Sequence, residues 1–483
     1  MSAAPISLKK NFIMNALLTM STFLFPLITF PYVSRVLGPA GMGRVDFATS
    51  VLTYFSMIAQ LGIPTYGIRL CAKVRDDRRQ LTKTVQEILL LNTVTALVAY
   101  VVFFVLLFSV PRFYEDKTLF LIFSSTVLFN TIGVEWLYRA MEQYTYITVR
   151  SLIFKVIGVV AMFLLVHAES DYILYGGITI FAACASNVFN LFNLHRFVDL
   201  KPLGNYDLRR HMKPILVFFA MSCATTIYTH LDTVMLGFMR TDAEVGCYNA
   251  AIKIKVILVS AVTSLGTVLL PRASYYAQNK QTDELLRITK KAMNFVCLFA
   301  LPLTVYFMLF ARSGVLLLSG DAYTASVLPM QIIMPTLLFI GMTNILGMQI
   351  LVPLGREKTV LLSEIVGAVV NLALNWLLIP PLGAVGAAVG TVVAEAAVWV
   401  VQCVCLRDLV KQTYRHVRVG VLLLGVTIGT VAGGWVSALP LSEFAQLLLS
   451  AVLFFGAYLT TMLICKEPLT RELLETARAR LRR

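Results

Sequence analysis

The chain has 483 residues, of which 58% are hydrophobic and only 14% are charged. A soluble domain has about a quarter charged residues, and a mean hydropathy of +0.78 leaves more apolar surface than a soluble globule could bury. The net charge of +15 would suit nucleic acid, but no dense basic block with interleaved aromatic residues accompanies it. Composition therefore excludes a soluble fold, argues against nucleic acid as a partner, and predicts an all-α integral membrane protein.

Apolar stretches long enough to cross a bilayer recur along the whole chain. The predicted spans are residues 12–34, 45–68, 85–110, 118–138, 146–167, 172–194, 214–238, 246–271, 292–318, 326–352, 359–380, 382–406, 417–437 and 443–465. The first run contains Pro26 and Pro31, exceeds the apolar core of a signal peptide in length and lacks a small-residue cleavage site, so we expect it to be retained. The least secure division is at residues 380–381, where almost no loop separates two spans.

The distribution of basic residues predicts the topology. With the N-terminus in the cytoplasm, 32 of the 41 Lys and Arg residues fall in inside segments. The outside loops then hold only Arg35, Arg44, Arg112, Lys117 and Arg240. This imbalance follows the positive-inside rule, and a missed span would destroy it. We therefore expect fourteen spans with both termini in the cytoplasm. Since no outside loop exceeds about ten residues, we expect no extramembrane catalytic domain and no enzyme.

An internal repeat divides the spans. Leu37-Gly38 and Gly43 near the first hairpin correspond to Leu236-Gly237 and Gly246 near the seventh, at offsets of 199 and 203 residues. Because six spans separate the two copies, they have the same orientation, which predicts two parallel six-helix lobes. The expected domains are an N-terminal lobe, a cytoplasmic amphipathic linker, a C-terminal lobe, and two extra helices with a basic cytoplasmic tail, at residues 1–198, 199–213, 214–411 and 412–483.

Several segments carry a family resemblance. PYVSRVLGPAGMGRVDFATSV (31–51), LGIPTYGIRLCAKVRDD (61–77), GVEWLYRAMEQYTYITVRS (133–151) and LDTVMLGFMRTDAEVGCYNAAIKI (231–254) resemble polysaccharide flippases of the Wzx type. That family belongs to the superfamily of the multidrug and toxin extruders and the lipid II flippase. The resemblance implies two six-helix lobes around a central cavity, alternating access, and a bacterial cytoplasmic membrane.

The resemblance also implies the cargo and the partners. The cargo would be an oligosaccharide linked to a polyprenyl pyrophosphate of the undecaprenyl type, destined for a cell-surface polysaccharide. Membrane lipids, a polymerase and other polysaccharide assembly proteins would be the partners. No Walker motif is present, and the cysteines lack metal-ligand spacing, so we expect no nucleotide, cofactor or metal.

Basic residues inside spans are candidate ligands for an anionic head, because ionisable groups in the membrane are costly. Lys253 and Lys255 lie in span eight, two residues apart, so they cannot point the same way. One would bind phosphate, unless both are structural. Arg35 and Arg44 at the first outside hairpin suit bidentate phosphate binding. Alternatively they anchor the interface, with Arg44 pairing locally with Asp46.

Three acidic residues are candidates for ion coupling or for ion pairs. Asp232 could neutralise a lysine or carry a coupling cation, and Asp46 opens the second span. Glu395 lies near the middle of span twelve, where it could titrate, hold a cation, or stay protonated and bind a neighbouring helix.

Glu135, Arg150 and Lys155 cluster near the inner ends of spans four and five. They would form a cytoplasmic gate whose ion pairs break on opening, or a static network that holds a hairpin.

The alternatives are a cation-coupled multidrug exporter of the same superfamily and, in another class, a membrane-embedded polysaccharide polymerase. Against the exporter, the first span has no acidic residue. Against the polymerase, the outside loops are too short to carry acid and base groups.

Overall fold

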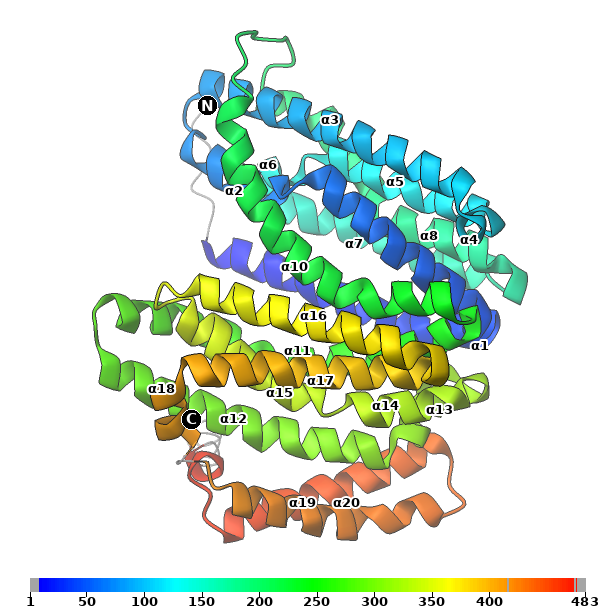
Figure 1. The fold of residues 1–483 in the computed structure, drawn as a ribbon, viewed down its shortest axis with the longest axis vertical. Helices are drawn as coiled ribbons and strands as arrows, with labels where there is room; N and C mark the ends of the chain where they lie inside the picture. Colours follow the sequence, from blue (N-terminus) through cyan, green and yellow to red (C-terminus); the bar gives the residue numbers. More distant parts are fainter. Residues whose placement is uncertain (1–7, 415–416, 473–474, 476–483) are drawn as a thin grey trace. The chain divides into compact units, whose positions relative to one another are not determined.

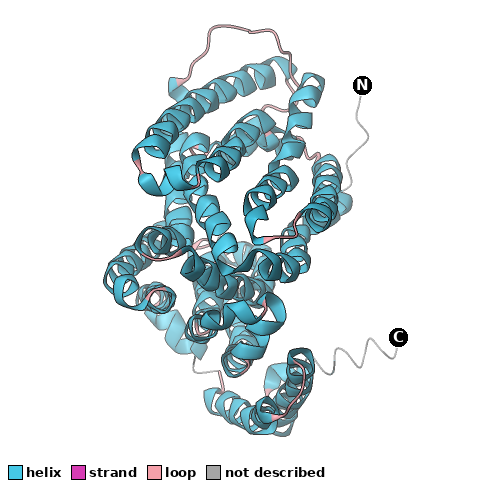
Figure 2. Ribbon diagram, turned by 90° about the vertical axis from the view of Figure 1, so that its right-hand side faces the viewer, coloured by secondary structure: helices cyan, strands magenta, loops and turns pink. Residues whose placement is uncertain are grey.

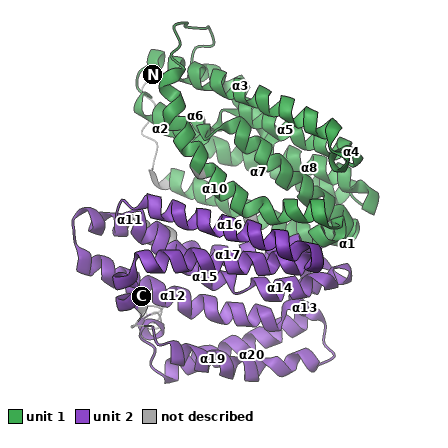
Figure 3. Ribbon diagram, in the orientation of Figure 1, with its two compact units in different colours: residues 1–246 green, residues 247–483 purple. Residues whose placement is uncertain are grey.

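The computed structural model describes residues 8–414, 417–472 and 475, and these residues form helices joined by loops, without strands (Figures 1 and 2). Most of the basic tail predicted at the end of the chain lies outside the described residues. The chain packs as two compact units, residues 1–246 and 247–483 (Figure 3). This division falls after α10, whereas the sequence repeat divides the lobes before it. The lobe boundaries therefore stay a prediction.

Unit 1 contains ten α-helices and three short 3₁₀ turns among its described residues. The helices are α1 (Leu8–Gln60), α2 (Ile63–Lys73), α3 (Arg78–Ser109), α4 (Pro111–Glu115), α5 (Lys117–Gly133), α6 (Glu135–Ala140), α7 (Tyr144–Leu165), α8 (Tyr172–Cys184), α9 (Val188–Asn193) and α10 (Arg209–Met239). The turns are η1 (Glu169–Asp171), η2 (Ala185–Asn187) and η3 (Leu194–Arg196).

Unit 2 takes up most of α11, which begins at the end of unit 1. Its helices are α11 (Asp242–Gln278), α12 (Thr282–Leu309), α13 (Ala311–Ser319), α14 (Val327–Ile333), α15 (Thr336–Thr343), α16 (Glu357–Leu382), α17 (Ala384–Cys405), α18 (Arg407–Tyr414), α19 (Val419–Gly434) and α20 (Glu443–Ile464). It also contains 3₁₀ turns at η4 (Asp321–Ser326) and η6 (Trp435–Ala438) and a π-helix, η5 (Asn344–Leu351).

The helices confirm a polytopic protein with about fourteen spans. Eleven described segments are long and apolar enough to cross a membrane, or twelve with the bent pair at 321–351. The first of them covers 64 residues and contains a break at Gly38, so it holds two spans. The 17-residue α5 is the remaining span. The two spans predicted to divide at residues 380–381 are separate helices, but α16 continues through both prolines to Leu382 and the break lies at Gly383, with a φ of 56°.

The two repeated hairpins touch through their glycines, all within unit 1. A Cβ atom on Gly43 would lie 1.8 Å from the carbonyl oxygen of Asp242, and one on Gly246 would lie 2.0 Å from that of Pro39. Asp242 precedes Gly246 by four residues, as Pro39 precedes Gly43. The contact is therefore reciprocal, as expected for two copies of one motif packed around a pseudo-twofold axis.

A buried carboxylate joins α3 to the start of α10. Glu87 is 0% exposed and accepts hydrogen bonds from the backbone N–H of Asp207 (2.9 Å) and from the guanidinium of Arg210. His211 lies 2.9 Å from the same carboxylate, and its other ring nitrogen lies 2.8 Å from the Tyr66 hydroxyl. This network holds the predicted linker, residues 199–213, against α3 near Asp207. The linker is a loop only up to residue 208, because α10 begins at Arg209.

A second buried carboxylate lies beyond the last span, in unit 2. Glu467 is 1% exposed and accepts hydrogen bonds from Thr470, Asn294 and the N–H of Leu469. Burial alone would raise its pKa, but these hydrogen bonds hold the pKa of Glu467 below its ordinary value. A lowered folded-state pKa contributes stability at neutral pH that is lost as the pH falls through that pKa.

Replacing Glu87 with alanine should destabilise unit 1. Removing one partner of a buried charged network leaves the others unpaired, at a cost of about 3 kcal/mol when a partner is half exposed, as Arg210 is. The measurement is the thermal unfolding midpoint of the purified protein in detergent. Asp76→Ala is the control, since Asp76 is exposed on the loop before α3. Equal unfolding midpoints for both variants would contradict a stabilising role of the Glu87 network.

Replacing Gly246 with alanine should abolish the hairpin contact. The new methyl group would overlap a backbone carbonyl, which cannot move as a flexible side chain can. We expect a large loss of folded protein, measured as the monodisperse fraction in size-exclusion chromatography. Gly456→Ala in α20 is the control, because a Cβ there meets nothing within 4 Å. A normal yield of the Gly246 variant would show that the two hairpins do not pack closely at this glycine.

Candidate functional site

Two transmembrane helices of unit 1 carry stripes of neutral polar side chains. Positions separated by three or four residues share one helix face. The stripe on α1 consists of Thr49, Thr53, Ser56 and Gln60, and that on α10 of Ser222, Thr226 and Thr229. All seven are half-buried or exposed. Thr49, Thr53 and Thr229 donate to carbonyl oxygens of their own helices. The faces also present hydroxyl and amide groups to which water or a polar ligand could bind.

The two stripes meet at a neutral cavity of about 210 Å³. Its polar lining comes from Thr53, Ser56, Gln60, Thr65, Ser222 and Thr226, and no charged residue lines it. The hydroxyl oxygen of Ser56 is buried and has no hydrogen-bond partner in the described part of the chain. Hydroxyl and amide groups both donate and accept hydrogen bonds, so this lining suits neutral polyhydroxyl groups.

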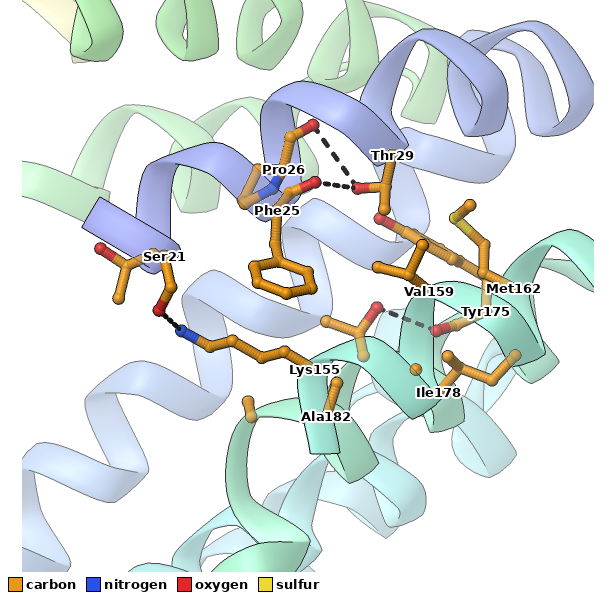
Figure 4. Close-up of a pocket in the computed structure, with 14 residues that line it drawn as sticks. Ser21, Phe25, Pro26, Thr29, Lys155, Val159, Met162, Tyr175, Ile178 and Ala182 are labelled. Carbon is orange, nitrogen blue, oxygen red and sulfur yellow. Dashed lines mark hydrogen bonds between the residues drawn. The ribbon is translucent and has the colours of Figure 1, made fainter. Parts of the chain in front are cut away.

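A second cavity, of about 300 Å³, lies between α1, α7 and α8 (Figure 4). Lys155 of α7 extends along it and donates a hydrogen bond of 2.7 Å to Ser21 Oγ of α1. Phe25 lies above the lysine, with its ring centroid 5.8 Å from the ammonium. The rest of the lining is mostly apolar, and includes Pro26, Met162 and Ile178.

The predicted gate residues do not form one cluster. Glu135 at the start of α6 pairs with Arg139 at 2.6 Å and approaches Arg150 at 3.5 Å. Arg150 is 7% exposed and donates to the carbonyl oxygen of Ser186 at 2.6 Å. The structure therefore brings Glu135 and Arg150 together, whereas the ammonium of Lys155 is bonded to Ser21.

Arg44 belongs to a charged cluster at the hairpin tips of unit 1. Its guanidinium lies 3.1 Å from the Asp242 carboxylate and 3.5 Å from that of Asp116, and it donates to the Tyr172 hydroxyl at 3.1 Å. Arg112 pairs with the same Asp242. The charge of Arg44 is thus compensated by carboxylates from the segments that precede α5 and begin α11.

The other predicted residues of unit 1 lie on α1 and α10. Arg35 is exposed on α1 and donates to the carbonyl oxygen of Pro31. Asp46 is half-buried on α1, and Asp232 is 6% exposed on α10. His230, beside Asp232 in sequence, lies 3.3 Å from the Ser50 hydroxyl of α1.

The predicted basic residues of unit 2 lie near the start of α11. Lys253 and Lys255 are both half-buried and flank Ile254, which is 4% exposed. Their spacing places them on different faces of the helix, as predicted for residues two apart.

Glu395 lies on a buried polar face between α16 and α17. Thr391, Glu395 and Gln402 share one face of α17, and Ser363, Asn371 and Asn375 share one face of α16. Gln402 donates to Ser363 Oγ at 3.1 Å, and Asn375 donates to Asn371 Oδ1 at 3.1 Å. Such a face could hold a proton or a cation. Among the described residues no three His, Cys, Asp or Glu side chains gather as metal ligands.

Sequence reasoning missed the polar stripes and the partners of Arg44. The stripes follow a helical period and could have been found by reading polar rather than apolar periodicity. The partners, Asp116 and Asp242, are 72 and 198 residues away from Arg44, and no local signal relates them.

Comparison with known proteins gives two family matches. Residues 8–277 match the family described as "Polysaccharide biosynthesis protein", and residues 218–377 match the MatE family. A relative from Escherichia coli K12, named "Putative O-antigen transporter", is 23% identical over 400 residues. That alignment covers 82% of this chain and 96% of the relative.

Two solved structures share the fold. One is the lipid II flippase MurJ in an inward closed conformation, with a TM-score of 0.75, 13% identity, and coverage of 96% of this chain and 100% of that one. The other is an inward-facing multidrug resistance MATE transporter of the MOP superfamily, with a TM-score of 0.62 and 13% identity. It covers 84% of this chain and 99% of that one. The all-α transporter fold expected from the sequence is confirmed.

The polar stripe of α1 should be accessible to water. We expect Thr53→Cys to react with a charged maleimide, because the reagent requires a thiolate, which forms in water and not in lipid. Ile58→Cys is the control, since Ile58 is exposed on the same helix but lies outside the stripe. The experiment uses a chain without its eight native cysteines. Equal labelling at both positions would contradict a polar path along this face.

Proposed function

This chain belongs to the polysaccharide biosynthesis protein family, and we propose that it is a flippase for oligosaccharides linked to a polyprenyl pyrophosphate. The observation that carries the proposal is the pair of neutral polar stripes on α1 and α10. Transmembrane helices that expose hydroxyl and amide groups are suited to a hydrated sugar head. The name of the Escherichia coli relative supports the same class of cargo.

The three parts of the cargo differ in chemistry, so each would contact a different part of the protein or the lipid. Its sugars would exchange hydrogen bonds with water for hydrogen bonds with the stripes. Its pyrophosphate would be attracted by basic residues, of which Lys253 and Lys255 in α11 are our candidates. Its polyprenyl chain would stay in the lipid, because transferring that chain into a polar path would be unfavourable.

The charged cluster at the hairpin tips is our candidate for the outer closure. On the predicted topology, Arg44, Arg112 and Asp242 lie at the extracytoplasmic end. Arg44 and Arg112 share one carboxylate, so opening would separate charged partners that water can then solvate. We assign Arg44 to this closure rather than to direct phosphate binding, and Arg35 to the rim of the same end. Asp46 lies two residues beyond Arg44 on α1.

Glu135 and Arg150 would form part of a closure at the opposite, cytoplasmic end. Their 3.5 Å contact is long for an ion pair and joins α6 to α7, so it could break without loss of either helix. Both chain termini would lie on this side of a bacterial cytoplasmic membrane. We also propose a polymerase and other polysaccharide assembly proteins as partners.

The driving force would come from the membrane potential or from a coupled cation. Moving an anion outward from a negative cytoplasm gains about 2.3 kcal/mol per charge per 100 mV. Glu395, on the buried polar face of α17, and Asp232, on α10, are the candidates for coupling. Each is 6% exposed.

Deletion and complementation test the function. Cells that lack the protein should accumulate undecaprenyl-linked repeat units in the cytoplasmic leaflet and lose surface polymer, and the intact chain should restore both. An unchanged lipid pool and polymer would reject the assignment. A multidrug exporter would instead change the drug tolerance of the cells and leave the lipid pool unchanged.

Replacing Lys253 and Lys255 singly with alanine should slow transport. Losing one charge-assisted hydrogen bond at the transition between states should lower the rate by about tenfold. The measurement is surface polymer in complemented cells at matched protein levels. Lys411→Ala in α18 is the control, because Lys411 is exposed on a short helix outside the apolar spans. Full activity of both single variants would remove these lysines from the cargo path.

A further inference from the structure

Lys155 places a positive charge at the middle of a transmembrane helix. It lies eleven residues into the 22-residue α7, so its Cα is about 16 Å from either helix end at 1.5 Å per residue. A lysine side chain cannot reach the membrane surface from this depth, as it does near helix ends. The ammonium must therefore be accommodated inside unit 1.

The charge of Lys155 has no carboxylate partner within salt-bridge distance in the described part of the chain. Its hydrogen-bond acceptor is the neutral Ser21 hydroxyl at 2.7 Å. Glu135, an acidic residue of the neighbouring α6, is held by Arg139 and Arg150. An ammonium has three N–H donors, and Ser21 uses one of them. Two donors therefore remain for a ligand.

Away from Lys155, the lining of the cavity is mostly apolar, apart from Tyr175 and two threonines. Its volume of about 300 Å³ equals that of roughly ten water molecules. The hydroxyls of Thr29 and Thr179 are bonded to carbonyls of their own helices, and Phe25, Met162 and Ile178 add apolar surface (Figure 4). A free hydrated anion would lose water where it contacts these apolar walls. A ligand with an anionic head and an apolar body could instead place its apolar body against them.

The space results from particular residues in the helices that surround it. Gly158 of α7 lies so close to α8 that a Cβ there would be 2.6 Å from the Ala182 side chain. The two helices therefore form a continuous wall with small side chains. On the opposite side of the cavity, Pro26 has no backbone N–H to donate to the carbonyl oxygen of Thr22. One helical hydrogen bond of α1 is therefore missing beside Lys155.

The cavity adjoins an exposed apolar surface of α1. Leu24, Leu27 and Ile28, on the same stretch of α1, are 47%, 39% and 58% exposed. Ala183, which lines the cavity from α8, is also exposed. An apolar chain lying along α1 could therefore extend from the bilayer to the lysine.

We propose that this cavity binds the phosphate of an anionic lipid, with the two remaining N–H groups of Lys155 donating to phosphate oxygens and the apolar chain lying along α1. The phosphate could belong to a bilayer phospholipid or to a polyprenyl phosphate, which present the same chemistry. The site lies within unit 1 and does not depend on the proposed transport of oligosaccharides.

The test measures thermal unfolding of the delipidated full chain in dodecyl maltoside. A lipid that binds the folded state raises the unfolding midpoint. We expect phosphatidylglycerol or undecaprenyl phosphate to raise it, and phosphatidylcholine or inorganic phosphate to have little effect. The concentration that gives half of the rise should increase about tenfold in Lys155→Met, as expected for the loss of one charge-assisted contact. Lys155→Arg should keep the response.

Two further variants make the result decisive. Lys117→Met removes an equal charge from an exposed site of the same unit and should respond like the intact chain. Ala183→Leu narrows the cavity, leaves the charge in place and should weaken the response, so it serves also if Lys155→Met does not fold. A response to phosphatidylglycerol alone would identify a bilayer lipid, and one to undecaprenyl phosphate alone would identify a polyprenyl ligand.

Three results would overturn the proposal. The first is an unchanged response in both Lys155→Met and Ala183→Leu. The second is an equal rise with phosphatidylcholine, which would show that the phosphate charge is not recognised. The third is an equal rise with inorganic phosphate, which would show that no apolar chain is needed.

Discussion

The structure depends on one constraint, that a polar group in hydrocarbon must find its partner within the protein. Asn92 of α3, for example, donates to the carbonyl oxygen of Ala59 at 2.9 Å, and Thr131 bonds its own helix at 2.8 Å. Most of the chain satisfies this constraint by forming apolar helices with internal hydrogen bonds. On the polar face of α1, Thr49 and Thr53 donate to carbonyl oxygens of their own helix, whereas the Ser56 hydroxyl has no partner in the described part of the chain. Ser56 therefore marks a place on this face where water or a ligand can supply a hydrogen bond.

The glycine contact at the hairpin tips shows how the constraint acts on packing. Helices in a membrane gain little from burying apolar side chains, so close backbone approach becomes a main source of attraction. Gly43 and Gly246 permit that approach, and each lies against the carbonyl oxygen four residues before the other. Arg44 and Arg112 then bind Asp242 beside the contact. Dispersion and charge pairing thus act together at this end of unit 1.

The sequence predicted the helical fold and the number of spans well, because hydropathy and the placement of Lys and Arg reflect the membrane directly. It also predicted that Gly43 and Gly246 are equivalent. It did not predict that the two glycines touch, because a repeat shows similarity and not contact. The partners of Arg44 were missed for the same reason. The expected local alternative was Asp46, two residues away, whereas Asp116 and Asp242 are brought close only by the tertiary fold.

The sequence indicated the types of residue in the candidate site better than it indicated how those residues are arranged. Intramembrane charge selected Lys155 and Glu135 as candidates, but only packing shows that Arg150 and Arg139 hold Glu135, whereas Lys155 faces a cavity. The polar stripes were overlooked because threonine and serine are common in membrane helices, where they bond their own backbone. Only their joint exposure on two neighbouring helices distinguishes them.

The contrast between paired and open polar groups bears on how such a protein could move a large head group. Charges at the helix ends of unit 1 are paired, so separating them requires compensation by water or by a ligand. The middle of unit 1 instead offers neutral hydroxyl groups on α1 and α10 and the ammonium of Lys155, which forms no salt bridge with a carboxylate among the described residues. Neutral hydroxyl groups exchange hydrogen bonds with water at little net cost, so a sugar head can pass without being held tightly. Strong binding would slow release, whereas a dispersed polar lining with few charges keeps every intermediate position similar in free energy.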